Sequence, residues 1–383
     1  MELVFDIETD DLDATEIHCI VAIDENNKQY TFDIIDDNIL KGLDFLAEAD
    51  KLIGHNIIGF DIPVIKKLHG INLWSKNKII DTLVLSRLFN PVREKGHSLK
   101  VWGSKLGVAK DIPPEDFTVY TKDTLKYCIK DVVLNKALFE YLKKESAGFS
   151  KSSIELEHHV TYILEQQKVN GFKIDIKHTT NLLSELNFKI KEVQDKVHNT
   201  FKPKWVDIKE VKPKLKQNGM LSKSGLTDYE YEDIKLSGNM KPFMRQDLVE
   251  FNLGSRKQIG EYLISFGWKP KKFTPTGQPI VDEGTLKKII HIKEAKLIAD
   301  FLLYQKRIAQ ISSWLDSIKA DDRVHGSVVS TGAITGRMSH RSPNMAQVPS
   351  VSSPYGEECR ACWIVDEGHK LVGIDASGLE LRL

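Results

Sequence analysis

Near its start the chain reads Leu3-Val4-Phe5-Asp6-Ile7-Glu8, an apolar run that two acids interrupt. The run over 3–7 predicts a β-strand. Side chains two positions apart on a strand leave the same face, so Asp6 and Glu8 emerge together. Two unpaired carboxylates beside an apolar strand are costly, and a divalent cation is the usual remedy. For an isolated pair, the alternative is the solvated edge of a sheet.

Alternating strand and helix patterns continue from this strand to about residue 145. Strand patterns recur at 17–23, 30–32 and 51–53, and helical patterns at 38–49, 61–68, 82–89 and 122–144. Strands followed by alternating helices and strands predict a mixed sheet with flanking helices, an α/β domain. Asp81 is expected to cap the helix at 82–89. The small, polar stretch 144–153 predicts a domain boundary, which we place after residue 148.

The rest of the chain has a different pattern. Apolar residues recur at helical spacing, which predicts a helical domain over 149–323, and strand-like pieces return over 324–383. A segment at 202–254 interrupts these helices. Its first part, 202–225, holds seven lysines against two acids and contains helix-breaking prolines and glycine. We therefore expect an exposed basic insertion.

The charge balance of the whole chain conceals a division. Lysine plus arginine and aspartate plus glutamate both total 54, so the formal net charge is zero. The first 60 residues, however, hold 15 acids and 3 lysines, a net charge of −12, which leaves +12 for the remainder. An acidic front is compatible with metal chemistry, and a basic rear is compatible with contact to phosphates.

Composition also bears on the cellular compartment. No run of about 18 apolar residues exists, so we predict no membrane-spanning segment. Four cysteines in 383 residues do not form a disulfide scaffold, which fits a reducing cytoplasm.

Two further acidic motifs follow in chain order. The segment His55-Asn56-Ile57-Ile58-Gly59-Phe60-Asp61 comes after a strand pattern, and Asp61 opens a helix. Tyr127 and Asp131 are four residues apart on a helix and share one face. Each motif has a simpler alternative, because Asp61 could be only a helix cap and a Tyr–Asp pair is often a surface pair.

In this order the three motifs resemble those of the DEDD exonucleases, in the subclass that carries a tyrosine. The resemblance covers residues 1–145 and implies an RNase H-like fold with 3′–5′ exonuclease activity on DNA. Two hard cations held by carboxylates can together activate water and stabilise a leaving oxygen. The implied cofactor is Mg²⁺, two ions per site, for which Mn²⁺ can substitute.

This resemblance assigns a role to each residue of the motifs. Asp6, Glu8 and Asp131 would hold the first Mg²⁺, and Asp6 and Asp61 would hold the second. Tyr127 would orient the attacking water against the terminal phosphodiester.

A second block of motifs lies near the end of the sequence. It consists of Thr331-Gly332-Ala333-Ile334-Thr335-Gly336-Arg337-Met338-Ser339, then Pro343-Asn344-Met345-Ala346-Gln347-Val348-Pro349, and last Gly373-Ile374-Asp375-Ala376-Ser377-Gly378-Leu379-Glu380-Leu381-Arg382. The first two segments resemble the entrance to the palm of family A DNA polymerases, and the third resembles motif A of that family. Segments 267–270, 276–283 and 353–357 are similar to the replicative polymerases of short-tailed phages of the T-seven type.

The second resemblance implies a helical polymerase thumb over 149–323 and the start of an α+β palm over 324–383. Asp375 and the carbonyl of Ala376 would hold a catalytic metal ion. Glu380 would select deoxynucleotides by crowding the 2′ position of the sugar.

DNA, as a primer–template and as a single-stranded 3′ end, is the implied partner. We expect the DNA contacts to come from Asn56 in the front part, Lys306 and Arg307 on a thumb helix, and Arg337 and Gln347 at the palm entrance.

The implied protein is the N-terminal portion of a phage replicative DNA polymerase, in the cytoplasm of an infected bacterial host. Up to Leu383 the sequence holds neither a fingers helix nor the second palm aspartate that polymerisation requires. We therefore expect a shortened chain or one part of a split polymerase, completed by a second chain. The insertion at 202–254 lies where the phage enzymes bind a processivity factor, host thioredoxin in the best-known case. A contact with DNA phosphates and a loop without function are the alternatives.

Two other functions remain open. The first is a free-standing 3′–5′ exonuclease similar to RNase D, whose rear part binds substrate, and the motif A segment argues against it. The second is a non-catalytic scaffold that binds single strands, and the intact acidic motifs argue against that.

Overall fold

The computed structural model describes residues 1–108, 113–289, 291–374 and 376–378. Contacts divide the chain into two compact units. The first combines Met1–Asp175 with Asp316–Leu383, and the second is Ile176–Leu315. The domain boundaries predicted at residues 148 and 323 remain predictions.

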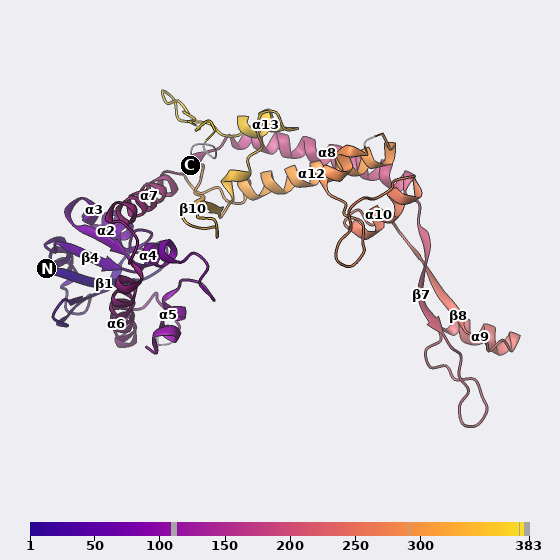
Figure 1. Ribbon diagram of the computed structural model, residues 1–383, viewed down its shortest axis with the longest axis horizontal. Helices are drawn as coiled ribbons and strands as arrows, with labels where there is room; N and C mark the ends of the chain where they lie inside the picture. The colour runs from indigo at the N-terminus through magenta and orange to yellow at the C-terminus, as the bar shows by residue number, and fades with distance from the viewer. Residues whose placement is uncertain (109–112, 290, 375, 379–383) are drawn as a thin grey trace. The chain divides into compact units, whose positions relative to one another are not determined.

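The first unit is built on a five-stranded sheet, coloured indigo to violet in Figure 1. Its strands are β1 (Glu2–Thr9), β2 (Ile17–Asp24), β3 (Gln29–Asp33), β4 (Lys51–Gly54) and β5 (Lys78–Asp81). They lie in the order β3-β2-β1-β4-β5. β1, β2 and β3 are antiparallel neighbours, whereas β4 runs parallel to β1 and β5 runs parallel to β4. The predicted mixed sheet is confirmed, and β5 is an edge strand that the sequence patterns did not identify.

Helices cover both faces of this sheet. They are α1 (Ile39–Ala47), α2 (Asp61–His69), α3 (Leu73–Lys76), α4 (Thr82–Phe89), α5 (Leu99–Leu106) and α6 (Lys122–Glu145). On one face, Leu3, Phe5 and Ile7 of β1 join a buried cluster with α1, α2 and α3. On the other face, Val4 joins a cluster with α5 and α6. Because side chains alternate along β1, Asp6 and Glu8 point to the same side as Val4, toward α6.

The remaining elements of the first unit come after the five-stranded sheet in sequence. They are α7 (Lys151–Asn170), β6 (Phe172–Lys173), β9 (Arg323–Val324), β10 (Ser327–Val329), β11 (Ser339–Arg341), the short 3₁₀ turn η1 (Met345–Gln347) and α13 (Gly356–Ala361). β6 pairs with β9, and β10 pairs with β11, both antiparallel. α7 packs against β5, α4 and β10, so it covers the edge of the sheet.

One strand expected from the sequence does not form. The apolar segment 370–374 has no regular secondary structure, and Leu371, Val372 and Ile374 are 67%, 77% and 95% exposed. A strand needs a neighbour to satisfy its backbone groups, and no described strand is paired with this segment.

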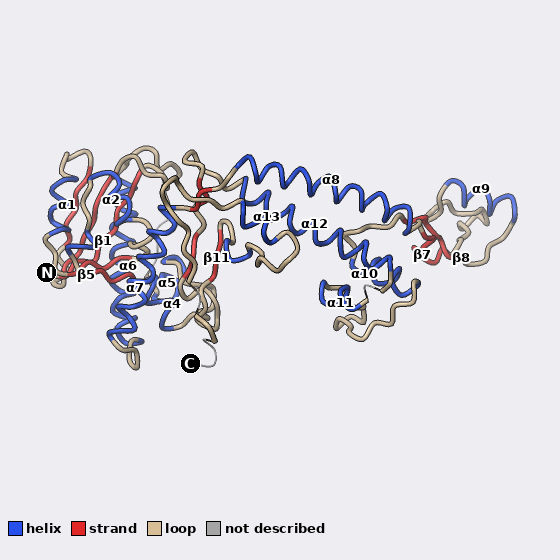
Figure 2. The backbone as a smooth tube through the Cα atoms, turned by 90° about the horizontal axis from the view of Figure 1, so that it is seen from above, coloured by secondary structure: helices blue, strands red, loops and turns tan. Residues whose placement is uncertain are grey.

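The second unit is built on two long helices. α8 (Ile176–Thr200) and α12 (Lys293–Leu315) lie side by side, as Figure 2 shows. α10 (Arg256–Ser265) and α11 (Glu283–Lys288) close a buried cluster around Phe201, Trp268 and Phe301. These helices agree with the helical pattern of the sequence.

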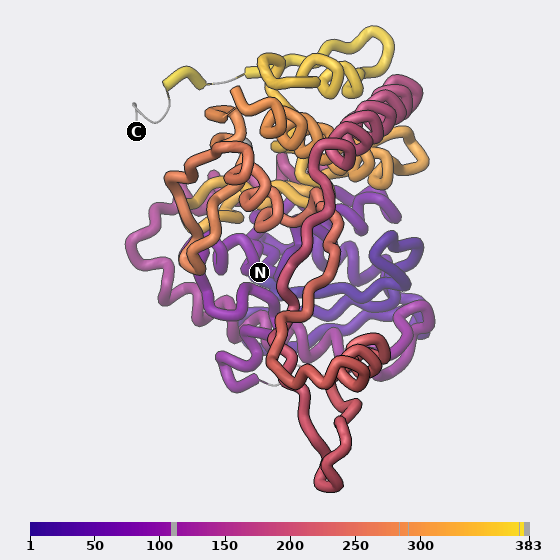
Figure 3. Tube along the Cα trace, turned by 90° about the vertical axis from the view of Figure 1, so that its right-hand side faces the viewer, coloured from indigo at the N-terminus to yellow at the C-terminus, as the bar shows by residue number. Residues whose placement is uncertain are grey.

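The insertion at 202–254 belongs to the second unit and is more ordered than its lysines and prolines indicate. β7 (Lys204–Val211) pairs antiparallel with β8 (Phe243–Val249), and α9 (Asp228–Ser237) lies between them in sequence. Figure 3 shows the two strands running alongside each other. Most of the segment is exposed, including the apolar side chains of Trp205, Tyr229 and Leu236.

Within the described ranges, every helix is too short or too polar to cross a membrane.

Candidate metal centre

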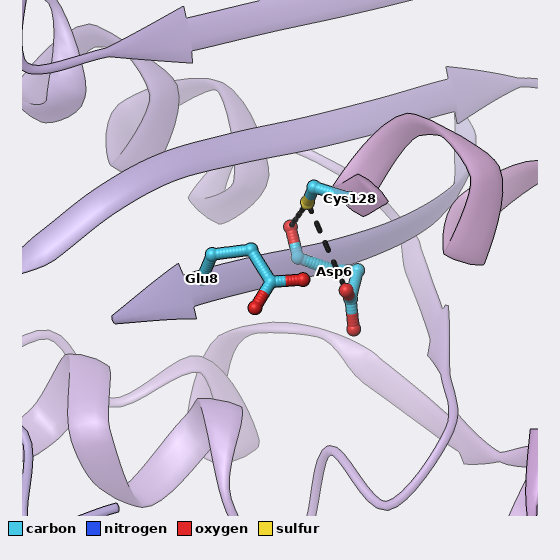
Figure 4. Close-up of side chains that lie close together, drawn as sticks. All are labelled: Asp6, Glu8 and Cys128. Carbon is cyan, nitrogen blue, oxygen red and sulfur yellow. Dashed lines mark hydrogen bonds between the residues drawn. The ribbon is translucent and has the colours of Figure 1, made fainter. Parts of the chain in front are cut away.

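Three possible metal ligands converge on β1. One ligand atom each from Asp6, Glu8 and Cys128 lies within 4.8 Å of the other two, and Figure 4 shows the three side chains facing one another. Asp6 and Glu8 are both partly buried, and Cys128 is fully buried. The predicted pairing of Asp6 and Glu8 on one strand face is therefore confirmed, and Cys128 is an addition.

Cys128 comes from α6, one residue after Tyr127. Its thiol donates weak hydrogen bonds to the backbone oxygen of Asp6 at 3.6 Å and to Oδ2 of Asp6 at 3.7 Å. Burial raises the pKa of the Cys128 thiol well above its usual value, and Cys19 and the nearby carboxylates raise it further. The thiol is thus a neutral donor in this state. Sequence analysis missed it, although Cys128 and Asp131 are three apart on a helix and share a face.

Asp61, at the start of α2, also contacts β1. It begins α2, is only 3% exposed, and its Oδ1 accepts a hydrogen bond from the backbone N–H of Ile7 at 3.2 Å. Burial raises the pKa of the Asp61 carboxyl to about 7, against the lowering effect of its backbone hydrogen bonds, and nearby Asp81 adds to the rise. Ile7 stands between Asp6 and Glu8 in sequence, so this bond ties Asp61 to the backbone of β1 at that point. Among the described residues, neither Asp61 nor Asp131 belongs to the group of ligand atoms within 4.8 Å that Asp6, Glu8 and Cys128 form.

The last motif lies on α6, whose first turn is fixed by a capping box between Thr121 and Thr124. α6 packs along β1 and β2. Tyr127 is half-buried and meets the ring of Phe117 edge-on, with 6.0 Å between the ring centroids. Asp131 is 5% exposed and lies one helical turn beyond Cys128.

The carboxylate of Asp81 binds the backbone of the loop between β4 and α2. The Asp81 carboxylate caps α4, as predicted, by accepting from the N–H groups of Leu83 and Val84. It also accepts from the N–H of Asn56 at 2.9 Å and of Ile58 at 3.1 Å. Asn56 has a φ of 67°, a left-handed conformation that is costly for a residue with a side chain. Asp81 therefore stabilises the strained turn that leads to Asp61.

The residues predicted to contact DNA differ in their exposure to solvent. Asn56, Lys306, Arg337 and Gln347 are exposed. Arg337 follows a tight turn at Gly336, and Gln347 ends η1. Arg307 is only 5% exposed and donates through Nη1 to Oε1 of Gln310 at 2.8 Å. Arg307 is therefore buried on α12 with its guanidinium bonded within the helix, which does not favour the predicted contact with DNA.

Two predicted palm residues, Asp375 and Glu380, lie outside the described residues. Ala376 is described and exposed.

Comparison with known proteins places the chain. A family model of DNA polymerase family A matches residues 234–383. The DNA-directed DNA polymerase of Escherichia phage T7 is 30% identical over 484 residues, which cover 99% of this chain and 68% of that protein. The DNA-directed DNA polymerase of Enterobacteria phage T3 is 30% identical over 491 residues, with the same coverage of 99% and 68%.

A solved structure has a similar fold. It is the POL domain of Pol1 from M. smegmatis in complex with DNA primer-template and dNTP, with a TM-score of 0.67 and 15% sequence identity. The match covers 96% of this chain and 55% of that one, so the chain spans about half the length of this neighbour. The two phage relatives decide the assignment, because their alignments cover 99% of this chain and 68% of each relative at 30% identity: the chain belongs to DNA polymerase family A.

Proposed function

We propose that residues 1–148 form a 3′–5′ exonuclease with an RNase H-like fold, which proofreads for a DNA polymerase. One observation carries the proposal. The Asp6–Glu8 pair and Asp61 are more than 50 residues apart in sequence, yet Asp61 accepts a hydrogen bond from the backbone of Ile7, the residue between Asp6 and Glu8 on β1. The sheet order β3-β2-β1-β4-β5 supports the proposed fold.

The side chains around β1 fit a pair of hard divalent cations. Carboxylate oxygens are the preferred ligands of Mg²⁺ and Mn²⁺. Asp61 is buried with a raised pKa, so a cation would relieve the cost of its negative charge. We propose that Asp6, Glu8 and Asp131 hold one Mg²⁺ and that Asp6 and Asp61 hold another. Bound there, the ions supply an activated water and stabilise the leaving oxygen.

The chain itself supplies orientation. We assign to the hydroxyl of Tyr127, whose ring meets Phe117 edge-on, the role of orienting the attacking water. We assign to Asn56, exposed on the turn that Asp81 fixes, a contact with the 3′-terminal nucleotide. The neutral Cys128 thiol keeps Asp6 in place by hydrogen bonding.

We further propose that 149–323 and 324–383 are the thumb and the opening of the palm of a replicative DNA polymerase. DNA is the proposed partner, contacted by exposed Lys306, Arg337 and Gln347. Polymerisation also needs the fingers and a second palm aspartate, supplied by further polypeptide. The exposed apolar residues of 370–374 support this, since they are suited to pairing with another strand.

The insertion at 202–254 is the proposed docking site of a processivity factor such as host thioredoxin. Its exposed apolar side chains, Trp205, Met220, Tyr229 and Leu236, support a protein partner over a purely electrostatic contact. The proposed location is the cytoplasm of an infected bacterium.

Digestion of a 3′-labelled single-stranded DNA, with and without Mg²⁺, tests the nuclease assignment. We expect Mg²⁺-dependent release of single nucleotides by the wild type and none by the double variant Asp6→Ala, Glu8→Ala. Equal digestion by both proteins would show that the cleavage does not use this site. A primer with a 3′ mismatch then tests proofreading directly.

A further inference from the structure

A buried histidine of α7 contacts the support of the candidate site. His158 is 3% exposed, and its Nε2 lies 2.9 Å from the backbone nitrogen of Asp81. Its Nδ1 lies 2.8 Å from the backbone oxygen of Ile154, one turn earlier on α7. A backbone N–H can only donate and a carbonyl can only accept, so Nδ1 carries the proton and Nε2 accepts from Asp81.

His158 supplies the hydrogen-bond acceptor that the edge of the sheet lacks at Asp81. β5 is an edge strand, and Asp81 is its last residue, paired with Gly54 of β4 on the inner side. The outward N–H of Asp81 has no sixth strand to receive it, and a buried N–H without an acceptor is costly. Nε2 of His158 accepts the hydrogen bond that a sixth strand would otherwise accept.

Neighbouring contacts hold α7 firmly in this position. Tyr162 of α7 stacks on Trp74 of α3, with ring centroids 4.2 Å apart and planes 3° from parallel. His159 meets the same Trp74 ring edge-on at 5.5 Å. A cavity of about 210 Å³ lies beside His158, lined also by Trp74, Ile79 and Ile80.

Asp81 is connected by hydrogen bonds to the loop that leads to Asp61. Its carboxylate binds the N–H groups of Asn56 and Ile58, and the backbone oxygens of Asn56 and Ile57 accept from the N–H groups of Phe60 and Ile62. The loop is also packed closely against β4, since a Cβ at Gly54 would overlap the side chain of Ile57. The loop therefore follows Asp81 as one piece, with Asp61 at its end.

We propose that His158 is a positioning residue of the nuclease site, acting through Asp81 on the loop that carries Asn56 and Asp61. The inference rests on the proposed exonuclease function. It assigns to α7, which lies beyond the predicted nuclease domain, a part in setting the geometry of that domain's site.

Two substitutions of similar size separate the hydrogen bond from packing. His158→Gln keeps an acceptor at about the reach of Nε2, whereas His158→Met fills the space without a good acceptor. Met is preferable to Ala, because the adjoining cavity would let water replace a smaller side chain. Leu156, which is 64% exposed on the same helix, provides the control, Leu156→Gln.

We expect His158→Met to lower kcat for digestion of single-stranded DNA about tenfold and to raise the Mg²⁺ concentration for half-maximal activity, since small displacements of reacting groups are costly. For His158→Gln we expect a kcat within about twofold to threefold of the wild-type value, because the acceptor for the Asp81 N–H is kept. Equal kcat and equal Mg²⁺ dependence in the Met and Gln variants would overturn the inference. Thermal unfolding of both verifies that they are folded.

Calorimetric titration of the same full-length variants with Mn²⁺ gives a readout that needs no catalysis. If wild type digests no DNA, the proposed exonuclease function fails. Weaker Mn²⁺ binding by the Met variant than by the Gln variant would still support the positioning role, and equal binding would refute it.

Discussion

The backbone N–H of Ile7 donates a hydrogen bond to Oδ1 of Asp61 over 3.2 Å, in the buried space between β1 and the start of α2. Ile7 contributes its side chain to the apolar core and its backbone to the site. Slipping β1 by one residue would turn Asp6 and Glu8 into that core and leave Asp61 without this donor. The packing of the sheet and the geometry of the candidate metal centre are therefore fixed together.

Replacing Asp61 by Asn tests this relationship. The amide keeps the size of the side chain and an oxygen that accepts from Ile7, so the fold should persist. The charge is lost, and with it a proposed metal ligand. We expect Mg²⁺-dependent exonuclease activity to fall by at least about a hundredfold, since even outer-sphere supports of a metal cost up to that factor. The control is Asp44→Asn, an exposed acid on α1; a similar loss in both variants would contradict the assignment.

The raised pKa of Asp61 predicts a pH dependence of stability in metal-free protein. A carboxyl with a folded pKa of about 7 and an ordinary pKa when unfolded favours the folded state only while protonated. Its contribution is full below about pH 4 and is lost as the pH rises through about 7. The unfolding free energy of wild type in EDTA should fall across this range relative to Asp61→Asn. Parallel pH profiles of the two proteins would rule out a buried, proton-binding Asp61.

All four cysteines, Cys19, Cys128, Cys359 and Cys362, are buried, and none is part of a disulfide. Because burial raises the pKa of Cys128, little thiolate exists to react. We expect iodoacetamide to leave Cys128 unmodified in native protein and to alkylate it after unfolding in urea. Peptide mass spectrometry measures both states. Rapid native labelling of Cys128 would mean that the site opens to solvent on the α6 side.

Local patterns predict most of the sheet, its main helices and the shared face of Asp6 and Glu8, whereas Asp61, Tyr127 and Asp131 are predicted only through the resemblance of the motifs to the DEDD exonucleases. Alternation over 3–7 and helical spacing at 122–144 decide which faces are buried. Cys128 was missed, since a lone cysteine on an apolar helix face looks like any core residue. His158 was missed for a different reason. Its role depends on which N–H the edge strand leaves open, and that is a property of strand order rather than of neighbouring residues.

The insertion offers a test that is independent of catalysis. Glu230 caps α9 together with Thr227 and accepts from Nε of Arg245 on β8 at 2.7 Å, so it joins the helix to the hairpin. Gln can still act as the third residue of the capping box, but it loses the ion pair with Arg245. We expect Glu230→Gln to speed amide exchange in α9 up to about fivefold, as the loss of an ion pair worth up to about 1 kcal/mol implies. The exposed neighbour, Glu232→Gln, should change little. Equal exchange in both variants would show that the Arg245 bond does not stabilise α9.

The same carboxylate should respond to acid. The Arg245 hydrogen bond lowers the pKa of Glu230 to about 2. Its stabilising effect is therefore present above the ordinary glutamate pKa and is lost as the pH falls toward 2. Protection of α9 in wild type should decrease over this interval, relative to the Gln variant, when exchange is corrected for its intrinsic pH dependence. A constant difference between the two proteins from pH 5 to about pH 2 would contradict the ion pair.

Primer extension tests the proposed palm. Leu371, Val372 and Ile374 are exposed, and segment 370–374 pairs with no described strand. Two-metal catalysis needs a backbone in fixed geometry, and an extended segment gains that from a neighbouring strand. We therefore expect residues 1–383 alone to digest a primer in Mg²⁺ and to add no nucleotide when dNTPs are supplied. Adding a polypeptide with the fingers and the remaining palm should produce extension. The double variant Asp6→Ala, Glu8→Ala keeps the primer intact during this assay and so separates weak synthesis from rapid digestion. Extension by that variant without the added polypeptide would show that the described part of the palm is sufficient for synthesis.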